Sequence, residues 1–415
     1  MEQLPVKEAS RSKKDYLKMS HSVLGNHLKT EQRKLRPGHK ISDFITKQFW
    51  SWVYNYLKSR FGKRFPYQTY DSTDTGIYRL PGNTCIAITA DWATDTAESF
   101  GIASKIRQHD PDYTIHLGDT YYVGAPHEIA SNFLHPQSPW PRGKKGSFAL
   151  LGNHEMYARG DAYFKYLLKS IGLRTESNKF SGQKASFFCL ENEYWRILGL
   201  DTGYNSIGKI PVLELLPWFA PDCRFEDAMM DWLRDVVRLG DPADKRGLLI
   251  LTHHQYVTAF HAESEYSKPA TQLASFIGKD RPVLWIWGHE HKLSAFEKIQ
   301  VNDGITAYGR CIGHGGMPVE LDSKSFKLNP GARGYQSLVM VDDRRKQGSD
   351  FGFNGYVTVN INGAELCIQY YDDTQKIMCE KWYSDLSGAI QGTINIEPSA
   401  GLETNRNRPI SDATS

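Results

Sequence analysis

"YTIHLGDTYY" (residues 113–122) joins a short apolar segment to a glycine, an aspartate and two tyrosines. The apolar segment has the length and composition of a buried strand, and Gly118 is typical of the turn that follows one. A turn explains the glycine, but it does not explain why Asp119 is followed by the phenol of Tyr122. The explanation depends on whether other strands of the chain end in similar polar residues.

Five other short apolar runs are bounded by turn residues: "TCIAITADW", "SFALLGNHE", "YWRILGLDTGY", "GLLILTHHQ" and "VLWIWGHEH". Helix-like stretches lie between runs, such as "DTAESFGIASKIRQHD" and "EDAMMDWLRDVVRLG". This alternation predicts an α/β fold. After residue 350, alternating apolar residues flank Asn362-Gly363, which predicts an antiparallel hairpin that closes the domain.

The composition permits a large domain with extensions. The chain has 415 residues, of which 40% are hydrophobic. Its six cysteines are scattered, with several in apolar runs, and are expected to be buried thiols in a reducing compartment. We see no secretory signal and no apolar stretch long enough to span a membrane, so we expect a cytoplasmic protein, although export by a dedicated secretion system stays open.

Charge divides the chain into a basic front segment and a mildly acidic body. Residues 1–70 hold 15 Lys/Arg and 5 Asp/Glu, whereas the chain as a whole has a net charge of only +3. An amphipathic helix is predicted at about residues 42–61, either packed on the body or lying on an anionic membrane or a protein partner. We therefore expect a basic extension (1–70), a catalytic domain (71–387) and a mobile tail (388–415).

Polar residues suited to binding metal ions end five of the six runs. In chain order these ends carry Asp91, Asp119 with Tyr122, Asn153-His154, His253-His254, and His289 with His291. The fourth run also ends in an aspartate, Asp201, but "DTGY" is more typical of a turn. Ligands of open α/β sheets gather at the carboxyl ends of the strands, so these side chains are expected at one edge.

The donor types favour a particular chemistry. Carboxylate, amide and imidazole groups suit Fe, Mn or Zn. Two such ions about 3.5–4 Å apart can clamp the oxygens of a displacement at phosphorus. The pattern therefore predicts hydrolysis of phosphate esters.

The motifs "DWA", "GDTYY", "GNHE", "LTHH" and "GHEH" resemble, in order and separation, those of the calcineurin-like metallophosphoesterase superfamily. Most members have a histidine where this chain has Ala93. Purple acid phosphatases lack that histidine and use a tyrosine of the second motif, which corresponds here to Tyr122, with Tyr121 as the competing residue. The resemblance is to the small, mammalian-type purple acid phosphatases. It implies a four-layer α/β/β/α sandwich of two mixed sheets flanked by helices.

The resemblance also implies two metal sites that share one carboxylate. The ligands of the first metal would be Asp91, Tyr122 and His291. Those of the second would be Asn153, His253 and His289. Asp119 would bridge the two ions. The implied metals are Fe(III) at the Tyr122 site and Fe(II), Zn or Mn at the second site, with Mn/Mn or Zn/Zn as alternatives.

Three residues are implied at the substrate. Asn153 and His154 would bind the phosphate, and His154 would also act as general acid. His253 is the metal ligand by position, which leaves His254 to face the substrate. Glu155 and the glycine-rich stretch that contains His314 could also line the pocket, although the stretch equally suits a tight loop.

The leading hypothesis is thus an acid phosphatase-like enzyme in which a metal-bridged hydroxide attacks a phosphomonoester. A phosphodiesterase built on the same site, acting on a cyclic nucleotide, a nucleic acid or a phospholipid headgroup, is the first alternative. A non-catalytic binding protein on this fold is the second. Binding of nucleic acid through the basic residues 1–70 is less favoured, because those residues match no known motif.

Overall fold

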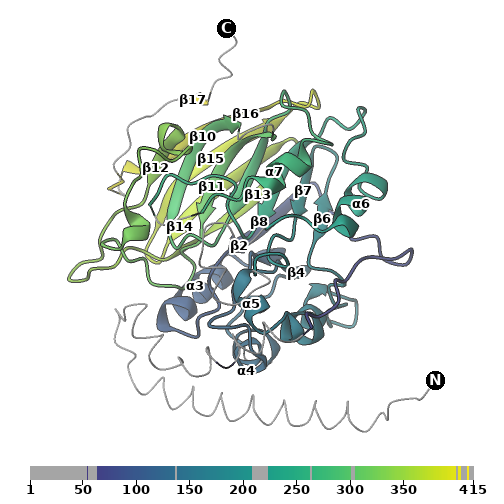
Figure 1. Ribbon diagram of the computed structural model, residues 1–415, viewed down its shortest axis with the longest axis horizontal. Helices are drawn as coiled ribbons and strands as arrows, with labels where there is room; N and C mark the ends of the chain where they lie inside the picture. The colour runs from purple at the N-terminus through teal and green to yellow at the C-terminus, as the bar shows by residue number, and fades with distance from the viewer. Residues whose placement is uncertain are drawn as a thin grey trace.

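The computed structural model describes residues 54, 63–135, 138–207, 223–261, 264–300, 304–398, 401–402 and 409–410. Two β-sheets occupy the centre, and short helices lie around them (Figure 1). The expected helix at 42–61 lies outside the described residues, apart from residue 54. No helix among the described residues is long and apolar enough to cross a membrane.

The first sheet has eight strands in the order β1-β6-β7-β8-β9-β11-β10-β12. The strands are β1 (Ile77–Arg79), β6 (Phe188–Glu191), β7 (Trp195–Gly199), β8 (Gly247–Thr252), β9 (Val283–Trp287), β11 (Thr306–Ile312), β10 (Leu293–Gln300) and β12 (Leu338–Val341). The neighbours from β7 to β11 are parallel, whereas β10 runs antiparallel to β11 and β12, so the sheet is mixed.

The second sheet has nine strands in the order β17-β16-β15-β14-β13-β2-β3-β4-β5. The strands are β17 (Pro409–Ile410), β16 (Ile390–Ile396), β15 (Lys376–Ser384), β14 (Glu365–Asp372), β13 (Gly355–Asn362), β2 (Asn83–Thr89), β3 (Tyr113–His116), β4 (Gly146–Ala149) and β5 (Gly172–Leu173). β2, β3 and β4 are parallel, and the strands from β13 to β17 form an antiparallel extension.

Two expectations for the end of the domain can be compared with this sheet. Asn362 pairs with Glu365 across a tight turn in which Gly363 has φ 57°, so the predicted hairpin is confirmed. The start of the tail at residue 388 needs correction, because β16 pairs with β15 and extends the sheet beyond that point. The alternating exposure along β16 is that of a strand packed on one face only.

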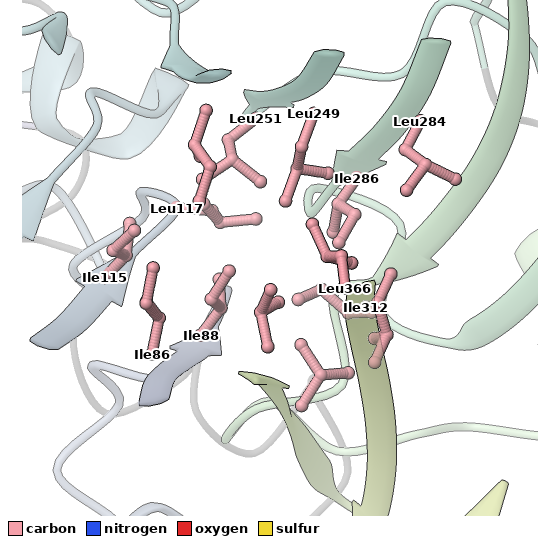
Figure 2. Close-up of a cluster of buried hydrophobic side chains, with 14 of the residues drawn as sticks. Ile86, Ile88, Ile115, Leu117, Leu249, Leu251, Leu284, Ile286, Ile312 and Leu366 are labelled. Atoms are coloured by element: carbon pink, nitrogen blue, oxygen red, sulfur yellow. The ribbon is translucent and has the colours of Figure 1, made fainter. Parts of the chain in front are cut away.

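Apolar side chains from both sheets form the central core. Ile86, Ile88, Ile115 and Leu117 of the second sheet point toward Leu249, Leu251, Leu284 and Ile286 of the first (Figure 2). All of these side chains are fully buried, and burial of each contributes about 1.5–3 kcal/mol. The sheets therefore pack face to face, which explains the continuous apolar runs in the sequence.

Helices pack on part of the outer face of each sheet and form the outer layers of the expected four-layer sandwich. The helical segments are α3 (Ala97–Gln108), α4 (Pro126–Ile129), η1 (Ala130–Leu134), α5 (Asn153–Tyr157), η2 (Tyr163–Leu167), η3 (Leu168–Ser170), α6 (Asp227–Asp235), α7 (Lys268–Leu273), η6 (Lys324–Phe326) and η7 (Tyr335–Ser337). α3 and its neighbours pack on the second sheet, and α6 and α7 pack on the first (Figure 1). The two-sheet α/β prediction is confirmed.

α3 illustrates how the sequence specifies these helices. The Thr96 side chain accepts a hydrogen bond from the Ser99 backbone N–H, which caps the first turn. Ser99, Ile102 and Ile106 share the buried face at helical spacing. One face of the helix therefore packs on the sheet, and β3 is the next strand along the chain.

Candidate metal centre

The carboxyl ends of five strands bring the predicted residues to one edge of the molecule. Asp91 follows β2, Asp119 follows β3, and Asn153 follows β4, in the second sheet. His253 follows β8 and His289 follows β9, in the first. Adjacent strands within each set are parallel, so their ends coincide.

Asp119 lies at the centre of the group and is buried. Its Oδ2 atom is 3.1 Å from the Tyr121 hydroxyl, 3.3 Å from His253 Nε2 and 3.7 Å from His154 Nε2. Its Oδ1 atom accepts a hydrogen bond from the His154 backbone N–H at 2.9 Å. One oxygen of this carboxylate is therefore held by the backbone, and the other faces donors from both sheets.

Three atoms lie close together on the Asp91 side of this carboxylate. The Tyr121 hydroxyl is 2.8 Å from Asp91 Oδ1 and 2.8 Å from His291 Nε2. His291 Nε2 is 3.6 Å from the same Asp91 oxygen. With Asp119 Oδ2, four electron-rich atoms therefore lie close together, and the phenol has a single hydrogen to share among them. A cation bound between these atoms would stabilise the arrangement.

A second group of donors lies on the other side of Asp119. Asn153 Oδ1 is 3.1 Å from His253 Nε2 and 3.0 Å from His289 Nδ1. His253 Nδ1 lies 3.0 Å from the Leu117 carbonyl oxygen, to which it donates, so in the neutral ring Nε2 carries the lone pair and faces the centre. The amide oxygen, the imidazole and the Asp119 carboxylate would then all be acceptors facing one another, which again fits a cation.

The charges of the isolated chain agree with this arrangement. Burial opposes ionisation of Asp119, but the nearby His253 and His154 rings hold its pKa well below the usual range. Burial likewise opposes protonation of His253, yet the Asp119 carboxylate raises its pKa to about 9. In the metal-free chain a proton on His253 therefore faces the Asp119 carboxylate, and a metal ion bound between the two side chains would replace that proton.

The tyrosine prediction is where sequence and geometry differ. Tyr121, and not Tyr122, brings its hydroxyl to Asp91, Asp119 and His291. The Tyr122 ring packs in a small apolar cluster with Val123, and its backbone N–H donates to Glu128. The Tyr122 carbonyl oxygen lies 2.6 Å from His154 Nδ1. The loop conformation, which residue spacing does not specify, decides which phenol enters.

Backbone geometry around the site explains the glycines of the motifs. Asp91, Asp119 and His289 have φ of 55°, 72° and 63°, a left-handed conformation that non-glycine residues adopt mainly at functional sites. A Cβ at Gly152 would lie 2.1 Å from Asp119 Oδ1. Gly118, at φ 107°, would place a Cβ 2.9 Å from His253 Nδ1. Side chains at either glycine would displace a candidate ligand.

The two remaining predicted histidines occupy different positions. His154 is partly exposed, and its ring lies 4.3 Å from that of Tyr121. Because Nδ1 donates to the Tyr122 carbonyl, Nε2 is the atom available to a substrate. His254 is buried beside His289, with ring centroids 4.6 Å apart, and its Nδ1 is 3.0 Å from Thr202 Oγ1.

Two buried carboxylates support the site in ways that the sequence did not indicate. Glu155 Oε2 accepts hydrogen bonds from the backbone N–H groups of Asp119 at 3.2 Å and Gly152 at 2.9 Å. The position of Glu155 after "GNH" had suggested that it lines the substrate pocket. It lies instead behind the metal-binding groups, where it holds their backbone. Glu128 accepts from the backbone N–H groups of Tyr122, Val123 and Ala125. Its spacing from Ala125, three residues into a new helix, was the available signal.

Two stretches with open interpretations have structural roles. Asp201 Oδ1 accepts from the backbone N–H groups of Gly203 and Tyr204, so "DTGY" is a side-chain-stabilised turn. His314 is buried, and the glycine-rich loop around it packs on the first motif, with Gly315 donating to the Ala90 carbonyl and Met317 to the Asp91 carbonyl. This loop fixes Asp91 from behind.

The described residues contain two groups of side chains close enough to hold an ion: Asp91, Asp119 and His253, and His253, His254 and His289. Two mixed sheets flanked by helices, with such a centre at the strand ends, define a metallophosphoesterase-like protein. Residues 85–293, half of the chain, match the family model of the calcineurin-like phosphoesterases. The chain belongs to this family, which implies a phosphoester substrate.

Solved structures show distant similarity. A purple acid phosphatase from yellow lupin (Lupinus luteus) is 14% identical with a TM-score of 0.41, over 71% of this chain and 53% of that chain. PhoD is 12% identical with a TM-score of 0.43, over 80% and 73%, and GAP50, an anchor in the inner membrane complex of Plasmodium, is 12% identical with 0.39, over 70% and 85%. The chain thus spans about half the length of the lupin enzyme. No curated protein matches the sequence.

Proposed function

We propose that this protein is a binuclear metal-dependent phosphoesterase of the purple acid phosphatase type, with a preference for phosphomonoesters. The observation that carries the proposal is the position of Asp119. Its Oδ2 atom lies 3.1 Å from the Tyr121 hydroxyl on one side and 3.3 Å from His253 Nε2 on the other. A carboxylate shared by two donor groups is what a pair of ions requires.

The proposed ligands differ from the sequence prediction at one position. Asp91, Tyr121 and His291 would hold the first ion, and Asn153, His253 and His289 the second. A phenolate is a strong anionic donor that favours Fe(III) over Fe(II), so we assign Fe(III) to the Tyr121 side and Fe(II), Zn or Mn to the other. When bound, the two ions would supply positive charge for the phosphate oxygens and lower the pKa of water.

The remaining chemistry belongs to residues of the chain. His154 Nε2 is partly exposed beside the centre, and its ring is oriented by the Nδ1 contact with the Tyr122 carbonyl. It would bind the phosphate and give a proton to the leaving oxygen. Asn153 would orient the phosphate, and His254, held by Thr202, would face it from the His289 side.

Metal content and hydrolysis test the proposal together. The purified full chain is expected to carry two metal ions, one of them iron, and to show a visible tyrosinate charge-transfer band. It should hydrolyse phosphomonoesters faster than matched diesters. Asp119→Asn is the blank, and Asp110→Asn, which changes an exposed aspartate paired with Lys144, is the matched control that should retain activity.

Different failures have different meanings. A wild-type protein no faster than Asp119→Asn on every monoester and diester would refute the enzyme and favour a binding role for the fold. A colourless, active protein with two Mn or Zn ions would refute the purple-type centre but keep the phosphoesterase. A faster reaction with diesters would refute the monoester preference.

A further inference from the structure

Two cysteines face each other on neighbouring strands of the second sheet, away from the metal centre's ligands. Cys367 lies on β14 and Cys379 on β15, and their sulfur atoms are 3.2 Å apart. In the sheet register Cys367 is opposite Lys381, and Cys379 is opposite Gln369, so the two thiols meet diagonally across the strand pair. Diagonal neighbours of an antiparallel pair lie about 7–8 Å apart, and the sulfur separation of 3.2 Å shows that these two side chains turn toward each other across that gap.

The face of the sheet that carries this pair is polar. Next to Cys367 in the register is Asn360 of β13, and next to Cys379 is Asn395 of β16. Core residues such as Leu366 and Ile368, which alternate with Cys367 along β14, point to the opposite face. Both cysteines are only half-buried, whereas Cys189, Cys223 and Cys311 are buried.

The expectation that the cysteines are buried thiols is therefore correct for Cys189, Cys223 and Cys311 and needs correction for the other three. Cys85, Cys367 and Cys379 are half-buried, and Cys85 lies opposite Asn360 on the same face of the sheet. Only Cys367 and Cys379 are in sulfur–sulfur contact among these three. The apolar residues next to these cysteines in the sequence point to the inner face of the sheet, whereas the thiols point to the outer face.

We propose that Cys367 and Cys379 form a reversible thiol modification site, in which a hydroperoxide oxidises the pair to a cross-strand disulfide between β14 and β15. The proposal rests on the contact between the two sulfurs, their access to solvent and the charge around them. Reactive cysteines occupy partly exposed, electropositive surroundings, and a second thiol within reach resolves the first oxidation product.

The surroundings indicate which thiol reacts first. The contact with the Cys367 thiol, together with Lys376 and Lys381, lowers the pKa of Cys379 to about 7, against the effect of burial. The same contact raises the pKa of Cys367. Since the thiolate is the nucleophile, Cys379 is the attacking residue at neutral pH.

The reaction balances in two steps. The Cys379 thiolate attacks one peroxide oxygen, an S–O bond forms, the O–O bond breaks, and hydroxide or alkoxide leaves and takes a proton. The Cys367 thiol then attacks the Cys379 sulfur, loses its proton, and displaces hydroxide, which leaves as water. The two thiols lose two hydrogen atoms, and hydrogen peroxide becomes two waters. A small thiol reductant reverses the change by exchange.

Peptide mapping gives a direct test, because Lys376 lies between the two cysteines and trypsin separates them. The reduced full chain is treated with hydrogen peroxide, blocked with an alkylating agent, and analysed as intact protein and as peptides. We expect the loss of two hydrogen masses, a peptide pair joined through Cys367 and Cys379, and full reversal by dithiothreitol. A peptide pair that instead includes Cys85 would overturn the proposal.

Matched serine variants complete the test. Cys379→Ser should abolish the mass loss, Cys367→Ser should leave Cys379 to form a sulfenic acid that dimedone traps, and Cys85→Ser should behave as wild type. Metal content checks folding of each variant, because neither thiol touches a candidate ligand. Equal alkylation of Cys367 and Cys379 before and after peroxide, or disulfide formation in Cys379→Ser, would overturn the assignment.

Discussion

Replacing each of the two adjacent tyrosines separately tests the geometry of the metal centre. In the structure the Tyr121 hydroxyl lies 2.8 Å from Asp91 Oδ1, 3.1 Å from Asp119 Oδ2 and 2.8 Å from His291 Nε2. Tyr121→Phe removes this oxygen and leaves the ring in place. Tyr122→Phe is the matched control, because Tyr122 contacts the site through its carbonyl oxygen, which the substitution retains.

The size of the expected effect follows from these contacts. A hydrogen bond to a charged group contributes about 1.5–3 kcal/mol. This range corresponds to roughly 10- to 150-fold in an equilibrium constant. Loss of residues that only support a ligand weakens metal binding about 10- to 100-fold, so a direct ligand belongs at or above the upper end. We therefore expect Tyr121→Phe to weaken binding at the first site by at least about 100-fold.

The assay is a metal titration of the chelator-treated protein, followed by its visible spectrum. Tyr121→Phe should lose both tight binding of one iron and the charge-transfer band. Tyr122→Phe should bind with wild-type affinity and keep the band. The reverse result, with iron and colour lost only in Tyr122→Phe, would refute the placement of Tyr121 and restore the ligand predicted from residue spacing.

Three further substitutions test other parts of the structure. Gly152→Ala places a Cβ 2.1 Å from Asp119 Oδ1, so phosphoesterase activity should fall about 100-fold in kcat/KM as the carboxylate shifts. Glu380→Gln removes the negative charge that pairs with the fully buried Arg310 and should lower the free energy of unfolding by about 3–5 kcal/mol in urea titrations. Burial lowers the pKa of His116 from its ordinary 6.5 to about 3, so the unfolded state binds the extra proton and stability falls with decreasing pH between these values. In metal-free protein, His116→Asn should remove up to about 1.4 kcal/mol per pH unit from that dependence.

Each of these three predictions has a result that would contradict it. Unchanged activity of Gly152→Ala would show that Asp119 can move without losing the site. An unfolding free energy of Glu380→Gln within about 1 kcal/mol of wild type would mean that Arg310 finds another partner. Identical pH dependence in His116→Asn and wild type would assign the acid sensitivity to other groups.

The family of the fold and most of its centre could be predicted from the sequence. Residues 247–254 and 283–291 each consist of an apolar run followed by histidines. The run is continuous because a strand buried on both faces carries apolar side chains on both. Parallel neighbours share the edge at which they end, so the order of the motifs was enough to place Asp91, Asp119, Asn153, His253 and His289 together.

Contacts between segments far apart in the chain could not be predicted in this way. Glu155, which follows β4, accepts hydrogen bonds from the backbone N–H group of Asp119, 36 residues earlier, and from that of Gly152. Similarly, Cys367 and Cys379 were separate thiols in the sequence, and only the register of β14 and β15 brings their sulfurs into contact.

The stretch "GDTYY" contains both kinds of information. Its sequence determined that a strand ends at a carboxylate with a phenol beside it, since these features depend on composition and on local turn chemistry. Which of two adjacent phenols faces Asp91 and His291 was decided by the tertiary structure. Successive side chains of an irregular loop point in directions set by its backbone. That backbone is held by Glu128, six residues beyond Tyr122, and by Glu155 from elsewhere in the fold.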